Sequence, residues 1–540
     1  MCGIFGLLIN NKENIDYEKL KKYFDYGKKR GPENSVIKNV NDDIIFGFHR
    51  LAINGLNEIS NQPIVDKNNI YILICNGEIY NYKELYKKFN FDNITNSDCE
   101  IIIHMYNLLG LNFINFLDGV FSFMLYDIDS DIVIIGRDPH GVRPLYCCNY
   151  ENDNIAFCSD LLPLMYDKKI KKINQFPPGT ICVYKKETNI FNKIHHEKYF
   201  YLDCNIIKDK ILHIEYYMYN YVDLLKKSIK KRVENCERPI ACLLSGGLDS
   251  SIISAYVKRF YNNTLETYSI GLKDAEDLKY ATIVSEHINS KHTSVIFKNE
   301  DFINSIPDVI KDIESYDTTT VRASVGNWNI GKYIKNNSNV KVIFNGDGAD
   351  ELMGGYIYFN CAPNNEDFHN ESIRLLENIS KYDVIRSDKS ISSHGLEPRT
   401  PFLDKELTKY YLSIPIEYRN HNNGNYCEKY FIRKAIELYD PDLLPKEVLW
   451  RTKEAFSDGV SSKHKSWFEI IQESDVVKNI ENKMTLEKMH NNPSTNEQLY
   501  YRTVFDNLYP NCDNLIPYFW MPKFIKNAHD SSARTLNIYK

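Results

Sequence analysis

The chain contains 540 residues, of which 43% are hydrophobic and 26% charged, so it can bury more than one core and we expect about two to four domains. Sixty-six Lys and Arg against 72 Asp and Glu leave a formal net charge of -6, which argues against a broad surface for nucleic acid or anionic lipid. The 13 cysteines lack the spacing of a disulfide framework or a zinc site, and no apolar stretch approaches the roughly 20 residues that span a bilayer. We therefore expect a soluble, cytoplasmic protein with reduced thiols.

The amino-terminal part of the chain alternates short apolar runs with turn residues, a pattern that predicts a β-rich domain. The predicted strands cover residues 4–9, 44–48, 70–75, 120–126 and 132–135. The acidic junction between the last two strands predicts a hairpin. Residues 101–109 have the length and continuity of a buried helix. Pro177-Pro178-Gly179 begins a final predicted hairpin. The domain is therefore expected to be of the α+β class.

After residue 201 the pattern changes to longer helical segments alternating with short apolar strands. Residues 216–233 and 251–260 predict helices, and residues 240–244 and 340–344 predict strands. Strands that alternate with helices indicate a parallel α/β sheet, whose ligands bind at the carboxyl ends of the strands. We place a domain boundary near residues 205–212, which gives domains of 2–205 and 212–540.

Cys2 follows Met1 directly, and removal of the methionine would give its thiol a free α-amine on the same residue. A thiol with a pKa of about 8.5 and an amine with a pKa of about 7.7–8.0 both titrate near neutrality, so the amine can accept the thiol proton directly or through water. This pairing is typical of a nucleophile with its own base. The alternative is a small apolar residue that opens the first strand.

Further motifs accompany Cys2 in a fixed order along the first domain. They are Cys2-Gly3-Ile4-Phe5-Gly6, Arg30-Gly31-Pro32, His49-Arg50-Leu51-Ala52-Ile53, Gln62-Pro63, Asn76-Gly77-Glu78-Ile79-Tyr80-Asn81, Ser97-Asp98-Cys99-Glu100, Gly136-Arg137-Asp138 and Arg143-Pro144-Leu145-Tyr146. Together they closely resemble the class II glutamine amidotransferase domain. The resemblance implies an Ntn-hydrolase-like sandwich of β-sheets with helices.

The same resemblance assigns roles to the residues of these motifs. Cys2 would form a thioester with the glutamine side chain, and the Asn76 side chain with the Gly77 N–H would stabilise the oxyanion. Arg50 would bind the α-carboxylate of glutamine, and Asp98 with Glu78 its α-ammonium. The full set expected to contact glutamine is Arg50, Leu51, Ala52, Ile53, Asn54, Asn76, Gly77, Glu78 and Asp98.

A glycine-rich loop, Ser245-Gly246-Gly247-Leu248-Asp249-Ser250, lies between the predicted strand at 240–244 and the predicted helix at 251–260. Glycines in this position let backbone N–H groups converge on phosphate oxygens, and the helix amino terminus adds partial positive charge. Asp249 can then hold a Mg²⁺ ion. The motif resembles the pyrophosphate loop of ATP pyrophosphatases; the alternative is a plain Gly-Gly connector.

A second glycine pattern, at residues 326–333, reads G-x-x-x-x-G-K but ends in Tyr333. A P-loop needs a Ser or Thr hydroxyl at that position for Mg²⁺. The apolar spacing of Val325, Trp328 and Ile330 suits an ordinary helix, so we reject a P-loop that cleaves ATP to ADP.

The remaining motifs extend the resemblance to the carboxyl terminus. They are Ser269-Ile270-Gly271-Leu272, Tyr316-Asp317, Val321-Arg322-Ala323-Ser324, Gly346-Asp347-Gly348-Ala349-Asp350-Glu351, Gly354-Gly355-Tyr356, Glu397, Arg399, Pro401-Phe402-Leu403-Asp404, Glu428-Lys429, Arg433-Lys434, Trp450-Arg451-Thr452-Lys453-Glu454, Phe456-Ser457-Asp458-Gly459 and Ser532-Ala533-Arg534-Thr535-Leu536. Over essentially the whole chain, the pattern is similar to the family of glutamine-hydrolysing asparagine synthetases.

This family resemblance implies a ligase that converts aspartate, glutamine, ATP and water into asparagine, glutamate, AMP and pyrophosphate. The intermediate would be β-aspartyl-AMP, aminated by ammonia that crosses an internal tunnel, in an enzyme that the family suggests is a homodimer. Asp249 and Asp350 would hold Mg²⁺ with pyrophosphate, Lys453 would stabilise the transferring phosphoryl group, and Asp347 would be a catalytic carboxylate. The residues expected to bind ATP are Leu243, Ser245, Gly246, Gly247, Asp249, Ser250, Ile270, Asn345 and Gly346.

The chain departs from the family pattern at one turn, where it reads Asn345-Gly346-Asp347-Gly348 instead of Ser-Gly-Glu-Gly. Asp347 keeps the carboxylate but shortens it by one methylene, and Asn345 replaces a hydroxyl with a larger amide. Two alternatives therefore stay open. The chain could be a related amidotransferase-fused adenylating ligase with another acyl substrate, or a non-catalytic protein that binds glutamine or ATP.

Overall fold

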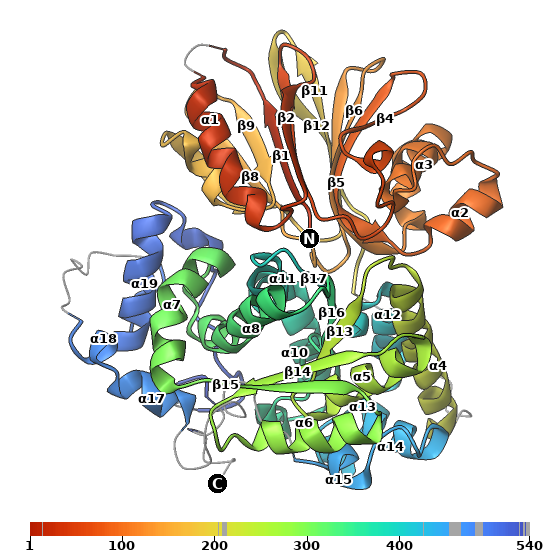
Figure 1. Ribbon diagram of the computed structural model, residues 1–540, viewed down its shortest axis with the longest axis vertical. Coiled ribbons are helices and arrows are strands. Elements are labelled where there is room, and N and C mark those ends of the chain that lie inside the picture. Colours follow the sequence, from red (N-terminus) through yellow and green to blue (C-terminus); the bar gives the residue numbers. More distant parts are fainter. Residues whose placement is uncertain are drawn as a thin grey trace.

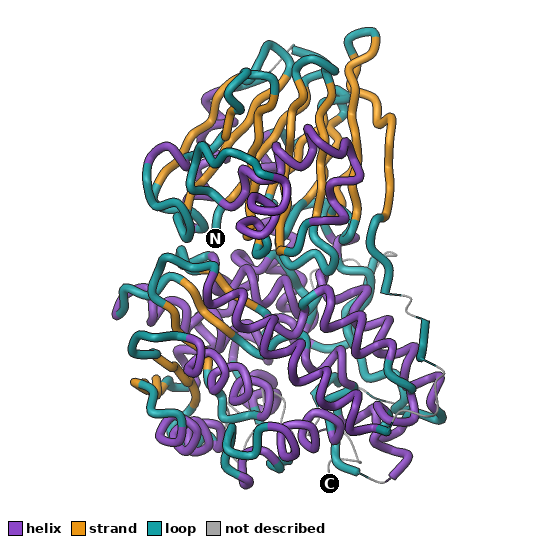
Figure 2. The backbone as a smooth tube through the Cα atoms, turned by 90° about the vertical axis from the view of Figure 1, so that its right-hand side faces the viewer, coloured by secondary structure: helices purple, strands orange, loops and turns teal. Residues whose placement is uncertain are grey.

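The structure is a computed structural model that describes residues 1–12, 15–202, 205–207, 213–424, 426–452, 466–480, 490–526, 528, 530–532 and 535. It has two domains, a strand-rich one stacked on a helix-rich one (Figure 1). The side view separates them clearly, with the strands of the first domain in orange above the helices of the second (Figure 2). The amino terminus lies between the two, so Cys2 is at their junction.

Two six-stranded antiparallel sheets form the first domain. One has the order β10-β8-β9-β1-β3-β2 and the other β12-β11-β7-β6-β5-β4. The strand bounds are β1 Gly3–Leu8, β2 Asn34–Asn39, β3 Ile44–Arg50, β4 Ile64–Val65, β5 Tyr71–Ile79, β6 Gly119–Asp127, β7 Ile132–Arg137, β8 Tyr146–Tyr150, β9 Ile155–Cys158, β10 Ile170–Gln175, β11 Thr180–Glu187 and β12 Ile190–Lys198.

The sheets pack face to face, because each contributes alternate apolar side chains to one shared core. Ile4 and Phe46 come from one sheet, and Met124 and Ile135 from the other. Helix α1 (Tyr17–Phe24) covers the outer face of the first sheet, and α2 (Tyr82–Phe89) with α3 (Ile101–Leu109) covers that of the second. The expected α+β sandwich of sheets with helices is confirmed.

The predicted strands and the helix at 101–109 are confirmed, but β5 is longer than expected. It continues through Asn76, Gly77 and Glu78 to Ile79, each paired with a residue of β6. Asn and Gly favour turns locally, yet the neighbouring ladder holds them in extended backbone. A Cβ at Gly77 would lie 2.5 Å from the Val120 carbonyl oxygen, so glycine is what allows this close approach. The extension places the predicted oxyanion donors at the end of a strand that points towards the domain junction (Figure 1).

A five-stranded parallel sheet, ordered β15-β14-β13-β16-β17, forms the centre of the second domain. Its strands are β13 Ile240–Leu243, β14 Glu266–Gly271, β15 Lys291–Ile296, β16 Val342–Phe344 and β17 Glu397–Arg399. The main helices are α4 Ile214–Glu234, α5 Leu248–Phe260, α6 Glu276–His287, α7 Asn299–Ile313, α8 Thr318–Asn337, α9 Ala349–Met353, α10 Asn365–Asn378, α11 Asp383–Ser392, α12 Lys405–Ser413, α13 Ile416–Arg419, α14 Tyr430–Tyr439, α15 Lys446–Leu449, α17 Trp467–Glu473, α18 Asp475–Lys478 and α19 Asn496–Leu508. The parallel α/β sheet is confirmed.

Helices lie on both faces of this sheet. One face packs against α7, α8 and α11, and the other against α4, α5 and α14. Helix α5 begins at Leu248, three residues earlier than predicted, with Gly247 as its N-cap. Asp249 and Ser250 therefore lie in its first turn. Residues 326–333 fall inside α8, which confirms their interpretation as an ordinary helix.

Among the described residues, the helices are all too short or too polar to cross a bilayer.

Candidate active sites

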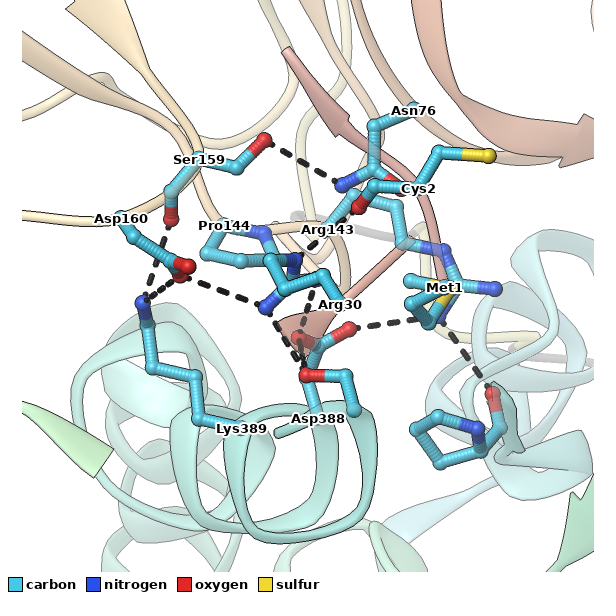
Figure 3. Close-up of polar contacts among 12 residues, drawn as sticks. Met1, Cys2, Arg30, Asn76, Arg143, Pro144, Ser159, Asp160, Asp388 and Lys389 are labelled. Carbon is cyan, nitrogen blue, oxygen red and sulfur yellow. Dashed lines mark hydrogen bonds and ion pairs between the residues drawn. The ribbon is translucent and has the colours of Figure 1, made fainter. Parts of the chain in front are cut away.

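Cys2 lies in the junction between the domains, at the start of β1 (Figure 3). Met1 is buried, and its amine donates a hydrogen bond of 3.1 Å to the carbonyl oxygen of Leu396 in the second domain. Burial lowers the pKa of that amine to about 5. The Cys2 thiol donates to the Leu51 carbonyl at 3.5 Å, and burial raises its pKa to about 11. In this form of the chain the sulfur is a protonated thiol.

Asn76 lies close to Cys2 with a fully buried side chain (Figure 3). Its Nδ2 is 3.5 Å from Ser159 Oγ, while its Oδ1 has no hydrogen-bond partner among the described residues. Among the described residues, the Nδ2 group makes only this one long contact, and an amide NH₂ has two hydrogens to donate. It is therefore suited to donate to an oxyanion beside Cys2.

Arg50, at the end of β3, is held entirely by neutral oxygens. Its guanidinium donates to the Asn57 carbonyl at 3.0 Å, to Asn61 Oδ1 at 2.6 Å and to the Gly55 carbonyl. Among the described residues, no carboxylate lies within ion-pair distance of it. Burial lowers the pKa of this guanidinium. A partly buried cation without a counterion is suited to bind a ligand carboxylate.

Glu78 and Asp98 form the acidic side of the same pocket. Glu78 accepts hydrogen bonds from Asn54 at 2.6 Å and from Asn235 at 3.2 Å, and Arg399 is 3.2 Å away. Burial, with the nearby Glu397, holds the pKa of Glu78 well above its usual value. Asp98 accepts the Ile79 N–H at 2.6 Å, and burial raises its pKa to about 7.

The segment between Arg50 and Asn54 links this pocket to the second domain. The Ala52 carbonyl accepts from Arg238 at 2.8 Å and the Ile53 carbonyl from the Glu237 N–H at 3.2 Å. Leu51 and Ile53 join the apolar core that is centred on the second domain. Both the backbone and the side chains of this segment are therefore fixed from across the junction.

A buried ionic network ties Cys2 to helix α11 of the second domain (Figure 3). Arg30 donates to the Cys2 carbonyl at 2.9 Å, to Asp388 at 2.7 Å and to Ser392 at 2.8 Å. The adjacent residue of the helix, Lys389, lies 2.7 Å from Asp160 of the first domain. These groups are almost fully buried, so removal of one partner would leave an uncompensated charge.

The second domain contains a cavity of about 190 Å³ at the carboxyl ends of its central strands. Of the residues predicted to bind ATP, all but Gly246 line it: Leu243, Ser245, Gly247, Asp249, Ser250, Ile270, Asn345 and Gly346. Gly246 has a φ of +71°, and a Cβ there would lie 2.4 Å from the Ala281 nitrogen. It therefore packs the loop against α6 instead of facing the cavity.

The two predicted metal ligands, Asp249 and Asp350, face each other across Lys429. The ammonium is 2.5 Å from Asp249 Oδ2 and 2.5 Å from Asp350 Oδ1. Asp249 Oδ1 is buried without a hydrogen-bond partner among the described residues. The Lys429 ammonium thus lies where the two carboxylates converge. The free oxygen of Asp249 is available to bind a second cation.

Asp347 lies in the cavity wall, where Arg386 of α11 holds its Oδ1 at 3.0 Å. Its Oδ2 is buried with no hydrogen-bond partner in the described part of the chain. Arg386 also lies 3.3 Å from Asp383. The Asn345 amide is held beside this space, because its Nδ2 donates to Ser387 at 2.7 Å and its Oδ1 accepts from the Asp347 N–H at 3.3 Å. The amide therefore has hydrogen-bond partners at both of its polar atoms and is fixed in place.

Known proteins match both domains of the chain. Residues 1–196 match the family model of the glutamine amidotransferase domain, and residues 220–368 and 360–524 match that of asparagine synthase. The asparagine synthetase (glutamine-hydrolyzing) of Homo sapiens is 41% identical over 570 residues, which cover 100% of this chain and 99% of the relative. That of Gallus gallus is 40% identical over 574 residues, with the same coverage.

The chain belongs to the family of glutamine-hydrolysing asparagine synthetases. The resemblance drawn from its motifs is confirmed. Lys453, the residue expected to stabilise the transferring phosphoryl group in this family, lies outside the described residues.

Several cavity residues have no role in the predictions made from the family's motifs. They are Glu351, Tyr356, Tyr382, Asp383, Arg386, Lys429, Arg451 and Trp520. Lys429 and Tyr356 lie within motifs that carry the resemblance, but nothing in their local sequence points to a ligand. Asp383 and Arg386 lie on one face of α11, three residues apart, which is a signal that helical periodicity could have supplied.

Proposed function

We propose that this protein is a glutamine-dependent asparagine synthetase. The observation that carries the proposal is that helix α11 contacts both sites. Its Arg386 forms an ion pair with Asp347 in the cavity. Its Asp388 forms an ion pair with Arg30, which donates to the Cys2 carbonyl. A site suited to release ammonia and a site suited to use it are thereby built onto one rigid element.

In the first domain, removal of Met1 leaves the α-amine of Cys2 in a dry junction. The surroundings that lower the pKa of the Met1 amine would keep a Cys2 amine neutral and able to accept the thiol proton. The sulfur then attacks the amide carbon of glutamine. Asn76 Nδ2 and the Gly77 N–H stabilise the oxyanion, ammonia leaves, and water hydrolyses the thioester to glutamate.

Substrate recognition in the first domain follows from the charges of the pocket. Arg50 binds the α-carboxylate of free glutamine, and Asp98 with Glu78 binds its α-ammonium. Glu78 accepts hydrogen bonds from Asn54 of the first domain and Asn235 of the second. Contact between the two domains therefore positions the acidic side of the pocket. Peptide-bound glutamine lacks both charges and is excluded.

In the second domain, the loop from Ser245 to Gly247 and the amino end of α5 bind the phosphates of ATP. An oxygen of the aspartate side-chain carboxylate attacks the α-phosphorus, and pyrophosphate leaves. Ammonia then attacks the activated carbonyl carbon and AMP leaves, while a carboxylate takes the excess proton. Asp347 suits this role, because its Oδ2 faces no protein donor among the described residues.

Asp249 and Asp350 fit a divalent cation, since a buried oxygen of Asp249 is unsatisfied and carboxylate oxygens are the ligands that Mg²⁺ prefers. When bound, Mg²⁺ would offset the negative charge of the departing pyrophosphate. Lys429 holds the two carboxylates together, and we propose that Lys453 supplies a second positive charge.

Phosphorus NMR of a reaction with glutamine, aspartate and Mg²⁺-ATP tests the proposal, with amino-acid analysis of the product. Asparagine together with AMP and pyrophosphate is expected. ADP and orthophosphate as primary products would reject the pyrophosphate loop. Another amide with AMP would indicate a related ligase, and no turnover would indicate a binding protein.

We further propose a homodimer in a reducing, cytoplasmic compartment, with domains at 2–205 and 212–540. The compartment is supported by the twelve cysteines of the described part, all of which are free thiols. Light scattering of the purified protein measures the oligomer, and intact mass reports whether Met1 has been removed.

A further inference from the structure

The carboxyl-terminal part of the chain supplies a wall of the synthetase cavity. Trp520 is 6% exposed and lines the cavity together with residues of the central strands and of α8 and α11. We call residues 513–520 the C-terminal strap. Apart from Trp520, the described residues that line the cavity lie between Leu243 and Thr452, so the strap reaches it from a separate part of the chain.

Three hydrogen bonds fix the strap against elements that also line the cavity. The Trp520 N–H donates to Asp317 Oδ1 at 2.7 Å, the Tyr382 hydroxyl to the Tyr518 carbonyl at 2.8 Å, and the Tyr316 hydroxyl to the Asp513 carbonyl at 2.6 Å. Asp317 is fully buried and caps α8, whose first turn lines the cavity. The strap and α8 therefore share one anchor.

The cavity has two ends, which differ in the residues that line them. The phosphate loop follows β13 at the centre of the sheet, with β14 on one side and β16 on the other. Leu243 of β13 and Ile270 of β14 supply an apolar surface on the β14 side, which suits a purine. The β16 side carries Asp347, with Arg386 beside it, and suits a charged amino acid.

Trp520 is on the charged side. Its ring centroid is 5.4 Å from that of Tyr356, whose hydroxyl donates to Glu351. Tyr382, which holds the strap, also lines the cavity and directly precedes Asp383 of α11. Tyr356, Tyr382 and Trp520 therefore line the same cavity as Arg386 and its carboxylates.

We propose that the C-terminal strap is a working part of the synthetase site, and that Trp520 walls the subsite of the acyl substrate and excludes water from its acyl-adenylate. The proposal deepens the proposed function and rests on it. Without the wall, water attacks the activated carbonyl carbon, AMP leaves and the amino acid is regenerated, so ATP is cleaved without amide formation. Trp520 acts here as a positioning residue: its ring limits where the acyl substrate can lie and keeps water away from the activated carbonyl carbon.

The test compares Trp520→Ala and Trp520→Phe with a matched control, Phe524→Leu. Phe524 lies in the same terminal segment and packs on Tyr358 and Phe359, but does not line the cavity. Trp520→Ala should raise the KM for aspartate about tenfold, as expected for a lost apolar pocket wall, and raise pyrophosphate released per asparagine several-fold. Trp520→Phe should recover most of both losses, and Phe524→Leu should show neither.

Glutaminase activity, measured as glutamate release without ATP, controls for folding and should stay at the wild-type level in all three variants. Wild-type KM for aspartate and a wild-type pyrophosphate ratio in Trp520→Ala would overturn the proposal. So would a pyrophosphate ratio raised equally in Phe524→Leu, because the effect would then belong to general loosening of the terminal segment.

A binding readout separates this inference from the proposed function. If the wild-type protein makes no asparagine, the proposed function fails, and tryptophan fluorescence during titration with Mg²⁺-ATP and then aspartate still reports on the wall. If the wild-type protein shows a fluorescence change that is absent from Trp520→Phe, the result would support the proposal that Trp520 lies next to the bound substrate. The same change in both proteins, or in neither, would contradict it.

Discussion

The two sites differ in how they treat charge. Around Cys2 the protein presents neutral donors, a guanidinium held only by neutral oxygens, and carboxyl groups whose pKa is raised by burial. Around the synthetase cavity, ionised groups alternate at contact distance, as in the pairs of Lys429 with Asp249 and Arg386 with Asp347. Acyl transfer at a thiol uses hydrogen-bond donors aimed at the oxyanion that develops, whereas transfer of an adenylyl group uses charges that are already in place around the phosphates.

Helix α11 is common to both regions. Its first turn faces the cavity through Asp383 and Arg386, and its later turns reach the first domain through Asp388 and Lys389. One helix therefore contacts both sites. Four variants or conditions test whether the two regions are separable as this contrast implies, from the largest effect to the smallest.

The largest effect is expected from Cys2→Ala. The substitution removes the proposed nucleophile, so glutamine-dependent synthesis should fall by about 10³-fold or more. Synthesis from added ammonium salt should persist, because the cavity does not involve Cys2. Amino-acid analysis with each nitrogen source checks this, and residual glutamate release near the wild-type rate would remove Cys2 from the mechanism.

Asp347→Asn should give the mirror image. It keeps the size of the side chain but removes its basicity and its ion pair with Arg386, a loss of about 10²–10⁴-fold for a positioned acid or base. Asparagine formation should fall with both nitrogen sources, while glutamine hydrolysis stays. Asp347→Glu restores the family's chain length and should keep activity, since the Asn345 amide is held by Ser387 and the Asp347 N–H. Wild-type synthesis by the Asn variant would assign the role to another acid.

A smaller effect, confined to glutamine binding, is expected from Arg50→Lys. An ammonium cannot reproduce a planar, two-point contact with a carboxylate, so the KM for glutamine should rise about ten- to a hundredfold, with little change in kcat. Arg259→Lys is the control, because Arg259 is partly exposed and pairs with Asp440, away from the pocket. A loss of kcat at unchanged KM would argue that Arg50 acts on the chemical step.

The smallest effect is a pH dependence set by Asp98, whose pKa burial raises to about 7. The carboxylate is charged above this value and protonated below it, so affinity for the glutamine ammonium is present at high pH and lost as pH falls. The KM for glutamine should rise about tenfold between pH 8 and pH 6. Asp98→Asn should flatten that profile and leave the pH dependence of ammonia-dependent synthesis unchanged. A profile that persists in the Asn variant would point to another group.

The residues proposed for the first site could be named from the sequence because they lie within contiguous motifs, and the structure brings them together from both sheets. The end of β5 was not predicted. Asn76 and Gly77 have the local preferences of a turn, and only the pairing with β6, more than forty residues away, keeps them extended. The helix at 101–109 was predictable to the residue, since its apolar continuity depends on nothing distant.

The second site was predictable only where one strand meets one helix, as in the phosphate loop. Lys429 reaches its two carboxylates from residues 180 and 79 positions earlier, and Trp520 enters from the far end of the chain. Such contacts depend on tertiary packing, to which local propensity and periodicity are blind. The exclusion of Gly246 from the cavity likewise depends on the close approach of α6.

The central claim, that one region supplies the ammonia that the other consumes, is tested by isotope competition. The wild-type protein is given amide-¹⁵N glutamine, aspartate and Mg²⁺-ATP in the presence of excess ¹⁴N ammonium, and the asparagine is analysed by mass spectrometry. Retention of ¹⁵N in the asparagine amide, at a fraction well above that of the dissolved pool, is the predicted result. Asparagine with the isotope ratio of the pool would contradict direct transfer between the two sites.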